Sequence, residues 1–322
     1  MEELLPALLA IVGGLIGLVW GADRFVIGAA GAAKNYGVSP LVIGLTVVSI
    51  GTSAPEIIVS INAALEGAGT IAVGNALGSN LANIGLVLGF TALIAPLPVQ
   101  RHLVFEEGPV LLLITALAGY CLYDQNLGWL ECALMLGLIP TLLWITIKYK
   151  RQHPDTEEVE AVAGSTTGKA ALWFFLGLGV MLLSAKFLVW GAQITAVKMG
   201  VSELVIGLSV VAIGTSLPEL AASVTSALRG HHDIAIGNVF GSNLFNLLAV
   251  MPIAGVIAPI ELDEAVFFRD YLSVAGLTLL MVLTIAFLYW RSKGRAFYFS
   301  RGFGGVLLLL YGLYFGVLFS SI

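Results

Sequence analysis

The sequence predicts an all-α polytopic membrane protein with about ten transmembrane helices, arranged as two inverted repeats of about five helices each. Three observations lead to this prediction. Hydrophobic residues make up 58% of the 322-residue chain and charged residues only 11%, whereas soluble domains carry about 25% charged residues. Long apolar segments follow one another along the chain, separated by short polar stretches. One stretch of about 47 residues occurs twice.

Each apolar segment is long enough for a transmembrane helix, which takes roughly 20 residues. The chain begins Met1-Glu2-Glu3 and lacks the basic region of a signal peptide, so we expect the first segment to be a transmembrane helix. The predicted spans are 5–33, 40–65, 70–97, 108–124, 127–148, 170–197, 203–228, 234–259, 266–290 and 302–321. The polar stretch in the middle is too short to form a domain. We therefore expect a first half (1–150), a linker (151–168) and a second half (169–322).

The two halves contain matching sequences. An offset of 163 residues aligns 37–83 with 200–246, with roughly 29 identities in about 47 positions. Since each half contributes an odd number of spans, the two halves must cross the membrane in opposite directions. Inverted repeats with broken helices around a shared midplane site are typical of secondary transporters.

Each repeat carries the core Gly-Thr-Ser-x-Pro-Glu, at 51–56 and at 214–219. Pro55 and Pro218 have no N–H group with which to continue the helix, and the neighbouring glycines lower the cost of opening the backbone. We therefore predict that helices 2 and 7 are broken here. Broken backbone at membrane depth is tolerated only where it is buried in protein or lines a wet cavity.

Oxygen-bearing side chains accompany each break. Ser49, Thr52 and Glu56 are spaced i, i+3, i+7, so they lie roughly on one helical face. The equivalent residues of the second copy are Ala212, Thr215 and Glu219. Intramembrane carboxylates mark ion pathways, and oxygen ligands suit hard cations such as Ca²⁺ and Na⁺, whereas zinc and copper prefer His and Cys. A structural ion pair of the glutamates with Arg24 or Lys186 is the alternative.

A second motif, Gly-Ser-Asn-Leu-x-Asn, completes each repeat at 78–83 and 241–246. Ser79 and Asn83 are spaced i, i+4 and lie on one face, as do Ser242 and Asn246. Their hydroxyl and amide oxygens can complete a cation shell. An interhelical hydrogen bond without ion contact is the alternative for the asparagines.

These paired motifs resemble the two α-repeats of the sodium/calcium exchangers, within the cation/Ca²⁺ antiporter superfamily, and the resemblance covers essentially the whole chain. It implies that Ca²⁺ is bound by Glu56, Glu219, Thr52 and Thr215. It also implies Na⁺ sites that use Ser79, Ser242 and the backbone carbonyls of Ser49 and Ala212, with Asn83 and Asn246 at the centre. Asn246 departs from the family pattern, since relatives often have Asp there. The linker is too short to hold the regulatory Ca²⁺-binding domains of animal exchangers.

The resemblance implies a secondary active antiporter that exchanges Ca²⁺ for Na⁺ by alternating access at a shared midplane site. Ca²⁺ antiport coupled to H⁺ is the alternative, because a glutamate in a low-dielectric site can carry a proton. A passive cation channel is less favoured, because an oxygen cage and an inverted repeat favour occlusion. Sequence motifs of enzymes are absent, as is a basic stripe for nucleic acid. We expect no enzymatic activity, no cofactor and no partner besides Ca²⁺, Na⁺ and the lipid bilayer.

The basic residues predict the orientation. In the ten-span topology, eleven Lys and Arg residues lie in loops on one side, and only Lys198 and Arg269 lie on the other. Loops rich in Lys and Arg stay in the cytoplasm. We therefore expect both termini outside and the linker in the cytoplasm, in a prokaryotic-type inner membrane.

Overall fold

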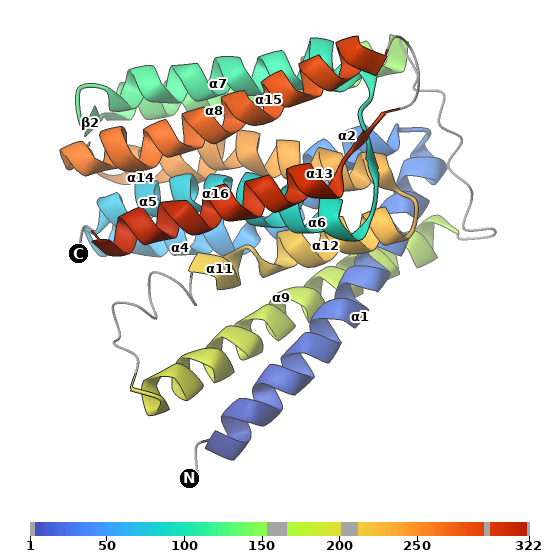
Figure 1. Ribbon diagram of the computed structural model, residues 1–322, viewed down its shortest axis with the longest axis horizontal. Coiled ribbons are helices and arrows are strands. Elements are labelled where there is room, and N and C mark those ends of the chain that lie inside the picture. The colour runs from blue at the N-terminus through green and yellow to red at the C-terminus, as the bar shows by residue number, and fades with distance from the viewer. Residues whose placement is uncertain (1–3, 153–165, 201–211, 293–296, 321–322) are drawn as a thin grey trace.

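The computed structural model describes residues 4–152, 166–200, 212–292 and 297–320, which are largely helical (Figure 1). The elements of the first half are α1 (Leu4–Tyr36), α2 (Pro40–Ile43), η1 (Gly44–Val48), α3 (Ser49–Thr52), α4 (Ala54–Leu65), α5 (Gly69–Ala82), η2 (Asn83–Leu88), α6 (Gly89–Ile94), β1 (Leu97–Pro98), η3 (Leu103–Glu107), α7 (Gly108–Leu122), β2 (Asn126–Leu127) and α8 (Trp129–Gln152), where η denotes a π-helical segment. Those of the second half are α9 (Thr167–Lys198), α11 (Ala212–Thr215), α12 (Leu217–Leu228), α13 (His232–Phe245), η5 (Asn246–Val250), α14 (Met251–Ile257), β3 (Ile260–Glu261), η6 (Val266–Tyr271), α15 (Leu272–Ser292), β4 (Tyr298–Phe299) and α16 (Arg301–Ser320).

The described helices confirm an all-α polytopic membrane protein. Eight of them are long and apolar enough to cross a membrane, and the bent pair Pro40–Thr52 and Ala54–Leu65 makes a ninth. The predicted span 203–228 lies partly outside the described residues, and α11 and α12 are its described part. The predicted start of the fourth span at 108 is wrong, because the helix begins at Leu103. Glu107 does not end the span, since it is buried and hydrogen-bonded by His102.

Both predicted helix breaks are confirmed. Helix α3 ends at Thr52, α4 begins at Ala54, and the two axes are bent by 46°. Ser53 lies at the break, with φ −82° and ψ 11°. In the second copy, Ser216 lies between α11 and α12 with nearly the same angles, φ −87° and ψ 2°. A proline in the first turn follows each break, where its missing N–H group has no helical partner to lose.

Irregular turns recur in both halves at the same 163-residue offset. Segments η2 and η5 begin at Asn83 and Asn246, and η3 and η6 begin at Leu103 and Val266. Such π-helical turns are rare and are often found at functional sites. Their recurrence supports the prediction that the two halves are copies of one fold.

Short strands between the helices join the two halves. Strand β1 of the first half pairs with β4 of the second, and β2 of the first half pairs with β3 of the second, both antiparallel. The main hydrophobic core is shared as well, since it contains buried side chains from both halves. The repeats are therefore intertwined and do not form separate domains.

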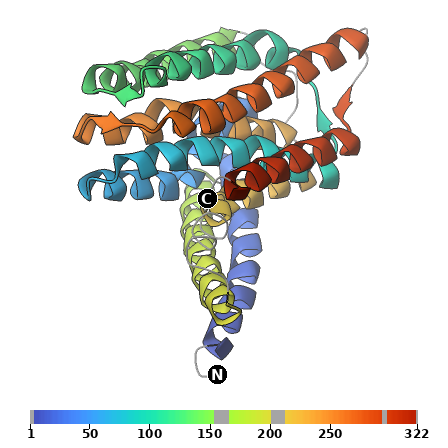
Figure 2. The ribbon, with the colours of Figure 1, turned by 60° about the vertical axis from the view of Figure 1, so that its left-hand side comes forward.

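Helices α1 and α9 stand apart from this core. They lie against each other along their length and cross the remaining helices obliquely (Figures 1 and 2). A smaller, separate hydrophobic cluster joins them to each other and to α12. Their backbones touch at glycines: a methyl group added at Gly28 would lie 2.6 Å from Phe174 Cα, and one at Gly177 would lie 2.7 Å from the Gly21 carbonyl oxygen. Only glycine fits at these two positions.

We predict that Gly177→Val lowers the free energy of unfolding by about 1–3 kcal/mol, because the added atoms force the two helix backbones apart. Gly179→Val in the same helix is the matched control, since a side chain there meets no atom within 4 Å. Thermal unfolding in detergent compares the two variants. Equal stability of both variants would contradict the close contact between α1 and α9.

Candidate ion-binding site

Glu56 and Glu219 lie in the first turns of α4 and α12, directly after the two breaks. The N-terminal end of a helix favours a negative charge, because its free N–H groups carry partial positive charge. Both side chains are nevertheless only 1% exposed and lie in segments that are expected to cross the membrane. Carboxylates at such positions require a compensating partner.

That partner is not a basic side chain of the described chain. Arg24 stacks on Trp173, with its guanidinium 4.8 Å from the ring centre, and its Nε lies 4.0 Å from Asp23. Lys186 is exposed on α9. The alternative in which Glu56 and Glu219 form structural ion pairs with Arg24 or Lys186 is therefore wrong.

Hydroxyl groups of one repeat reach the carboxylate of the other. Ser53 donates a hydrogen bond to Glu219 Oε1 at 2.9 Å, and Thr52 also interacts with Glu219. In the mirrored arrangement, Thr215 interacts with Glu56. The two carboxylates are close enough to repel each other. The structure therefore brings the four predicted Ca²⁺ ligands together from both repeats.

The serines and asparagines of the second motif complete the cluster. Ser79 donates to Glu56 Oε1 at 3.5 Å, and Ser242 Oγ accepts from Ser53 at 3.2 Å. Segment η2, which begins with Asn83, packs against α12, and η5, which begins with Asn246, packs against α4. Each asparagine therefore starts a turn that contacts the helix carrying the glutamate of the opposite repeat.

Several buried oxygens of this cluster have no hydrogen-bond partner within the described part of the chain. They are one carboxylate oxygen of each glutamate (Oε2 of Glu56 and Glu219), Oδ1 of Asn83 and Oδ1 of Asn246. Leaving such a group unpaired costs about 1–3 kcal/mol, and more for a charged group. Carboxylate and amide oxygens are the ligands that a hard cation prefers. Neither asparagine side-chain oxygen makes an interhelical hydrogen bond among the described residues.

The side chains of Ser49 and Ala212 are not seen to contact either glutamate among the described residues. The Ser49 hydroxyl turns into its own helix, where it donates to the Leu45 carbonyl at 2.8 Å. The Ser49 carbonyl oxygen accepts from Thr52 Oγ1 at 3.3 Å and so lies beside a predicted ligand. Ala212 begins α11, and its side chain lies outside the described part of the structure.

Ser53 and Ser216 were missed by the helical spacing rule. Both are fully buried at the breaks, and Ser216 Oγ has no partner among the described residues. Both serines belong to the duplicated Gly-Thr-Ser-x-Pro-Glu core, and this duplication is the sequence feature that could have identified them. A spacing of i, i+3, i+7 assumes a straight helix, whereas the break turns Ser53 toward Glu219.

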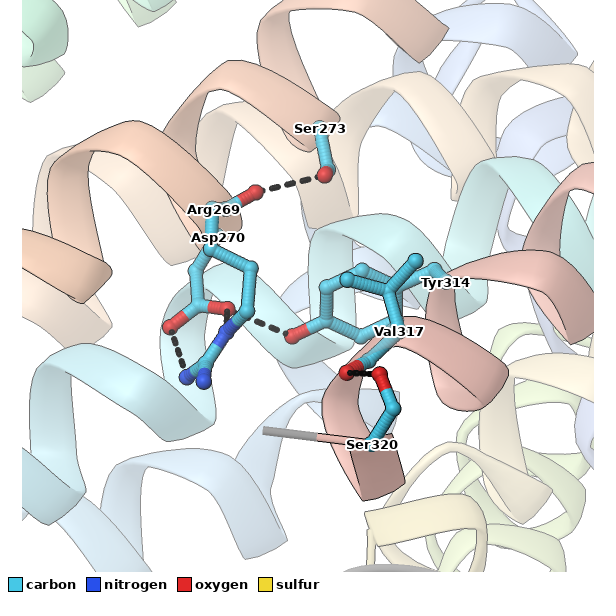
Figure 3. A network of polar contacts seen from close by, with 6 residues as sticks. All are labelled: Arg269, Asp270, Ser273, Tyr314, Val317 and Ser320. Atoms are coloured by element: carbon cyan, nitrogen blue, oxygen red, sulfur yellow. Dashed lines mark hydrogen bonds and ion pairs between the residues drawn. The ribbon is translucent and has the colours of Figure 1, made fainter. Parts of the chain in front are cut away.

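Two buried acids elsewhere among the described residues, Asp270 and Glu107, are held by neighbouring side chains. Asp270 accepts from Arg269 Nε at 2.7 Å, from Arg269 Nη2 at 3.0 Å and from Tyr314 OH at 3.0 Å (Figure 3). Glu107 is hydrogen-bonded to the ring of His102 at 2.9 Å. Glu56 and Glu219 differ from these two acids, since each keeps one buried carboxylate oxygen without a hydrogen-bond partner among the described residues.

Comparison with known proteins identifies relatives over nearly the full length. The sequence profile of the family described as "Sodium/calcium exchanger protein" matches residues 6–148 and 169–320. The chain is 42% identical to the putative antiporter CaxA of Alkalimonas amylolytica, covering 99% of this chain and 100% of the relative. It is 38% identical to the inner membrane protein YrbG of Escherichia coli (strain K12), covering 96% and 98%. It is 30% identical to the sodium/calcium exchanger MaX1 of Methanosarcina acetivorans, covering 95% and 96%.

Solved structures agree with the sequence comparison. The sodium-calcium exchanger NCX_Mj, soaked with zero Na⁺ and Ca²⁺, superposes with a TM-score of 0.83 at 30% identity, covering 98% of this chain and 99% of that one. The same exchanger soaked with 2.5 mM Na⁺ and 0.1 mM Ca²⁺ gives a TM-score of 0.81. The likeness extends over the arrangement of helices as well as the motifs.

We predict that Tyr314→Phe lowers the free energy of unfolding by about 0.5–1.5 kcal/mol, since it removes one hydrogen bond to Asp270. It should leave cation affinity unchanged, because Arg269, Asp270 and Tyr314 hydrogen-bond one another outside the candidate site. Glu219→Gln should show the reverse pattern, with cation affinity lost. Thermal unfolding and equilibrium Ca²⁺ binding in detergent measure the two properties. A loss of affinity in Tyr314→Phe as large as in Glu219→Gln would contradict the distinction.

Proposed function

This chain belongs to the sodium/calcium exchanger family, and from that premise we propose that it is an antiporter that exchanges Ca²⁺ for Na⁺ by alternating access. One observation carries the proposal: two buried carboxylates, one from each repeat, each interact with hydroxyl groups of the opposite repeat and keep one oxygen without a hydrogen-bond partner among the described residues. In this proposal Glu56, Glu219, Thr52 and Thr215 bind Ca²⁺. Flanking Na⁺ sites use Ser79, Ser242 and the carbonyls of Ser49 and Ala212, with Asn83 and Asn246 between them.

Competition for shared ligands couples the two ions. If Ca²⁺ and Na⁺ both need Glu56 and Glu219, the site holds one kind of ion at a time, and each ion must leave before the other binds. With both glutamates ionised and Asn83 and Asn246 neutral, the protein contributes about two negative charges. These balance one Ca²⁺ or two Na⁺. A third Na⁺ would move one net charge, worth about 2.3 kcal/mol per 100 mV.

Helices α1 and α9 are the proposed gate. They touch the other helices through a separate cluster, and glycines let their backbones lie in contact. The small residues lie between α1 and α9 and let the two backbones pack closely, so the pair moves as one unit in this proposal. A shift of this pair relative to the remaining helices opens the site to one side or the other in this proposal.

Coupling to H⁺ is the second candidate. Two carboxylates that are each 1% exposed and repel each other can share a proton in place of a cation. The relative CaxA bears only the description of a putative antiporter. The likeness to YrbG supports an inner-membrane location. We propose that both termini face outward and that the linker is cytoplasmic, as the distribution of Lys and Arg predicts.

Ca²⁺ uptake into proteoliposomes tests the function. Uptake should require Na⁺ inside the vesicles, and it should fail with K⁺ inside or after a pH jump alone. Glu56→Gln and Glu219→Gln should each abolish uptake, because each removes one of the two charges that hold Ca²⁺. Uptake driven by a pH jump alone would support H⁺ coupling. Uptake without any counter-gradient would indicate a channel, and full activity in both variants would overturn the proposed site.

Replacing Asn246 by Asp tests the charge balance. A carboxylate about 4 Å from a unit charge contributes about 4 kcal/mol at an effective dielectric constant of about 20. A divalent ion gains about twice as much as a monovalent one, so Asn246→Asp should lower the Ca²⁺ dissociation constant at least about tenfold and raise the Na⁺ concentration needed for competition. Asn126→Asp, at an exposed position in β2, is the control with the same charge change. Equal effects in the two variants would contradict a central place for Asn246.

A further inference from the structure

Asn238 of α13 joins both repeats through three hydrogen bonds. Its side chain is completely buried. The amide nitrogen donates to the Glu219 carbonyl oxygen at 3.3 Å and to Ser223 Oγ at 2.9 Å. The amide oxygen accepts from Thr52 Oγ1 at 3.1 Å. Because both N–H groups are used on α12, the amide oxygen is oriented toward Thr52 of the other repeat.

A hydroxyl group binds a cation through an oxygen lone pair, so its proton must point away from the ion. Three acceptors lie near the Thr52 hydroxyl: the carboxylate of Glu219, the carbonyl of Ser49 and the amide oxygen of Asn238. In the proposed function the Glu219 carboxylate binds Ca²⁺ and is then taken. Of the two acceptors that remain, the amide oxygen of Asn238 is the nearer to Thr52 Oγ1, at 3.1 Å against 3.3 Å for the Ser49 carbonyl.

We propose that Asn238 is a positioning residue, which takes the hydroxyl proton of Thr52 and thereby turns the Thr52 lone pairs toward the cation. This inference rests on the proposed function, since it requires Thr52 to be a ligand. Asparagine suits the task because it donates and accepts at once and adds no charge. Aspartate could accept from Thr52 but could not donate to Glu219 and Ser223 when ionised.

Ca²⁺ affinity in a double-mutant cycle tests this role. Asn238→Leu should raise the Ca²⁺ dissociation constant about tenfold, which corresponds to about 1.4 kcal/mol. In the Thr52→Val background the same substitution should raise it less than about twofold, since no hydroxyl proton is left to accept. Asn75→Leu is the matched control. Asn75 bonds the Glu56 carbonyl at 3.2 Å and Ser60 at 3.4 Å, so its effect should be the same with or without the Thr52 hydroxyl.

Thermal unfolding without Ca²⁺ accompanies each affinity measurement, and Asn238→Ala replaces Asn238→Leu if the larger side chain prevents folding. An affinity loss from Asn238 that is the same in both backgrounds would overturn the positioning role and leave Asn238 a structural residue. Unchanged Ca²⁺ affinity in Thr52→Val alone would overturn the proposed site instead, so the two failures are distinguishable.

A second inference comes from an ion pair between α1 and the turn after α12. Arg229 Nε donates to Asp23 Oδ1 at 2.7 Å, and Nη2 of Arg229 reaches the same oxygen. The two side chains are 36% and 31% exposed. This pair reinforces the packing of α1 against α12, and no comparable packing joins α9 to α4 among the described residues.

The 163-residue offset between the repeats relates this ion pair to a second pair of charged residues, in which the acidic and basic positions are exchanged. Asp23 corresponds to Lys186 of α9, and Arg229 corresponds to Glu66 at the end of α4, each 163 positions apart. Both Lys186 and Glu66 are exposed, and no ion pair joins them among the described residues. The two positions thus keep opposite charges while the signs are exchanged.

We infer that the two pairs alternate: Asp23–Arg229 holds α1 against α12 in the state described here, and Lys186–Glu66 holds α9 against α4 in the state that opens to the other side. In an inverted-repeat transporter the two repeats exchange conformations between these states. In the other state α9 then packs against α4 as α1 packs against α12 here, and Lys186 comes to lie beside Glu66.

Crosslinking tests the alternation in a background in which Cys121 and Cys132 are replaced by serine. A short bifunctional maleimide should join cysteines at 23 and 229, and separately at 66 and 186, in proteoliposomes. Each crosslink should stop Ca²⁺ exchange, and a variant with all four cysteines should carry one crosslink or the other in each molecule. Gel mobility after cleavage in the linker detects the crosslinks without any transport assay.

The control pairs Lys186→Cys with Leu65→Cys, one residue before Glu66 on a different face of α4, and should crosslink poorly. Failure of the 66–186 pair to crosslink while the 23–229 pair does would overturn the inference. Continued exchange in crosslinked protein would also overturn it. Because crosslinking is read without Ca²⁺ or Na⁺, it is independent of which ion drives transport.

Discussion

The burial of two carboxyl groups at membrane depth is the constraint on which the rest of this structure depends. Placing a charged side chain at the centre of a bilayer costs about 2.5–3.5 kcal/mol on insertion scales and more by simulation. The fold meets that cost in three ways. Each glutamate begins a helix, each receives hydroxyl groups from the opposite repeat, and each keeps one oxygen free for a further partner. The breaks in the helices follow from the same need, because an unbroken helix has no N-terminus at mid-membrane.

Duplication explains why neither half forms the site alone. Ser53 of the first repeat serves Glu219 of the second, and Thr215 serves Glu56 in the reverse direction. The short strand pairs and the shared core hold the halves together around this point. In the proposed mechanism the ligands therefore stay assembled while α1 and α9 move, as alternating access around a fixed site requires.

The proposed gate and the rest of the protein differ in how they pack. The main core contains large buried side chains from both halves, whereas α1 and α9 meet each other through glycine backbones and share a small cluster of their own. An exposed ion pair such as Asp23–Arg229 contributes only about 0–1 kcal/mol. That is enough to bias two states of similar free energy without locking either one.

The sequence by itself determined the membrane fold, the duplication, both helix breaks and the two central glutamates. Each of these depends on local properties: the length of an apolar segment, the missing N–H group of proline, or a carboxylate within an apolar segment. Only the tertiary structure decided that Arg24 turns to Trp173, that Ser53 hydrogen-bonds Glu219, that Glu107 lies inside a span and that Asn238 faces Thr52. The physical reason is that each of these depends on groups that distant or bent segments bring into contact. A spacing rule along one straight helix contains no information about atoms supplied by the opposite repeat.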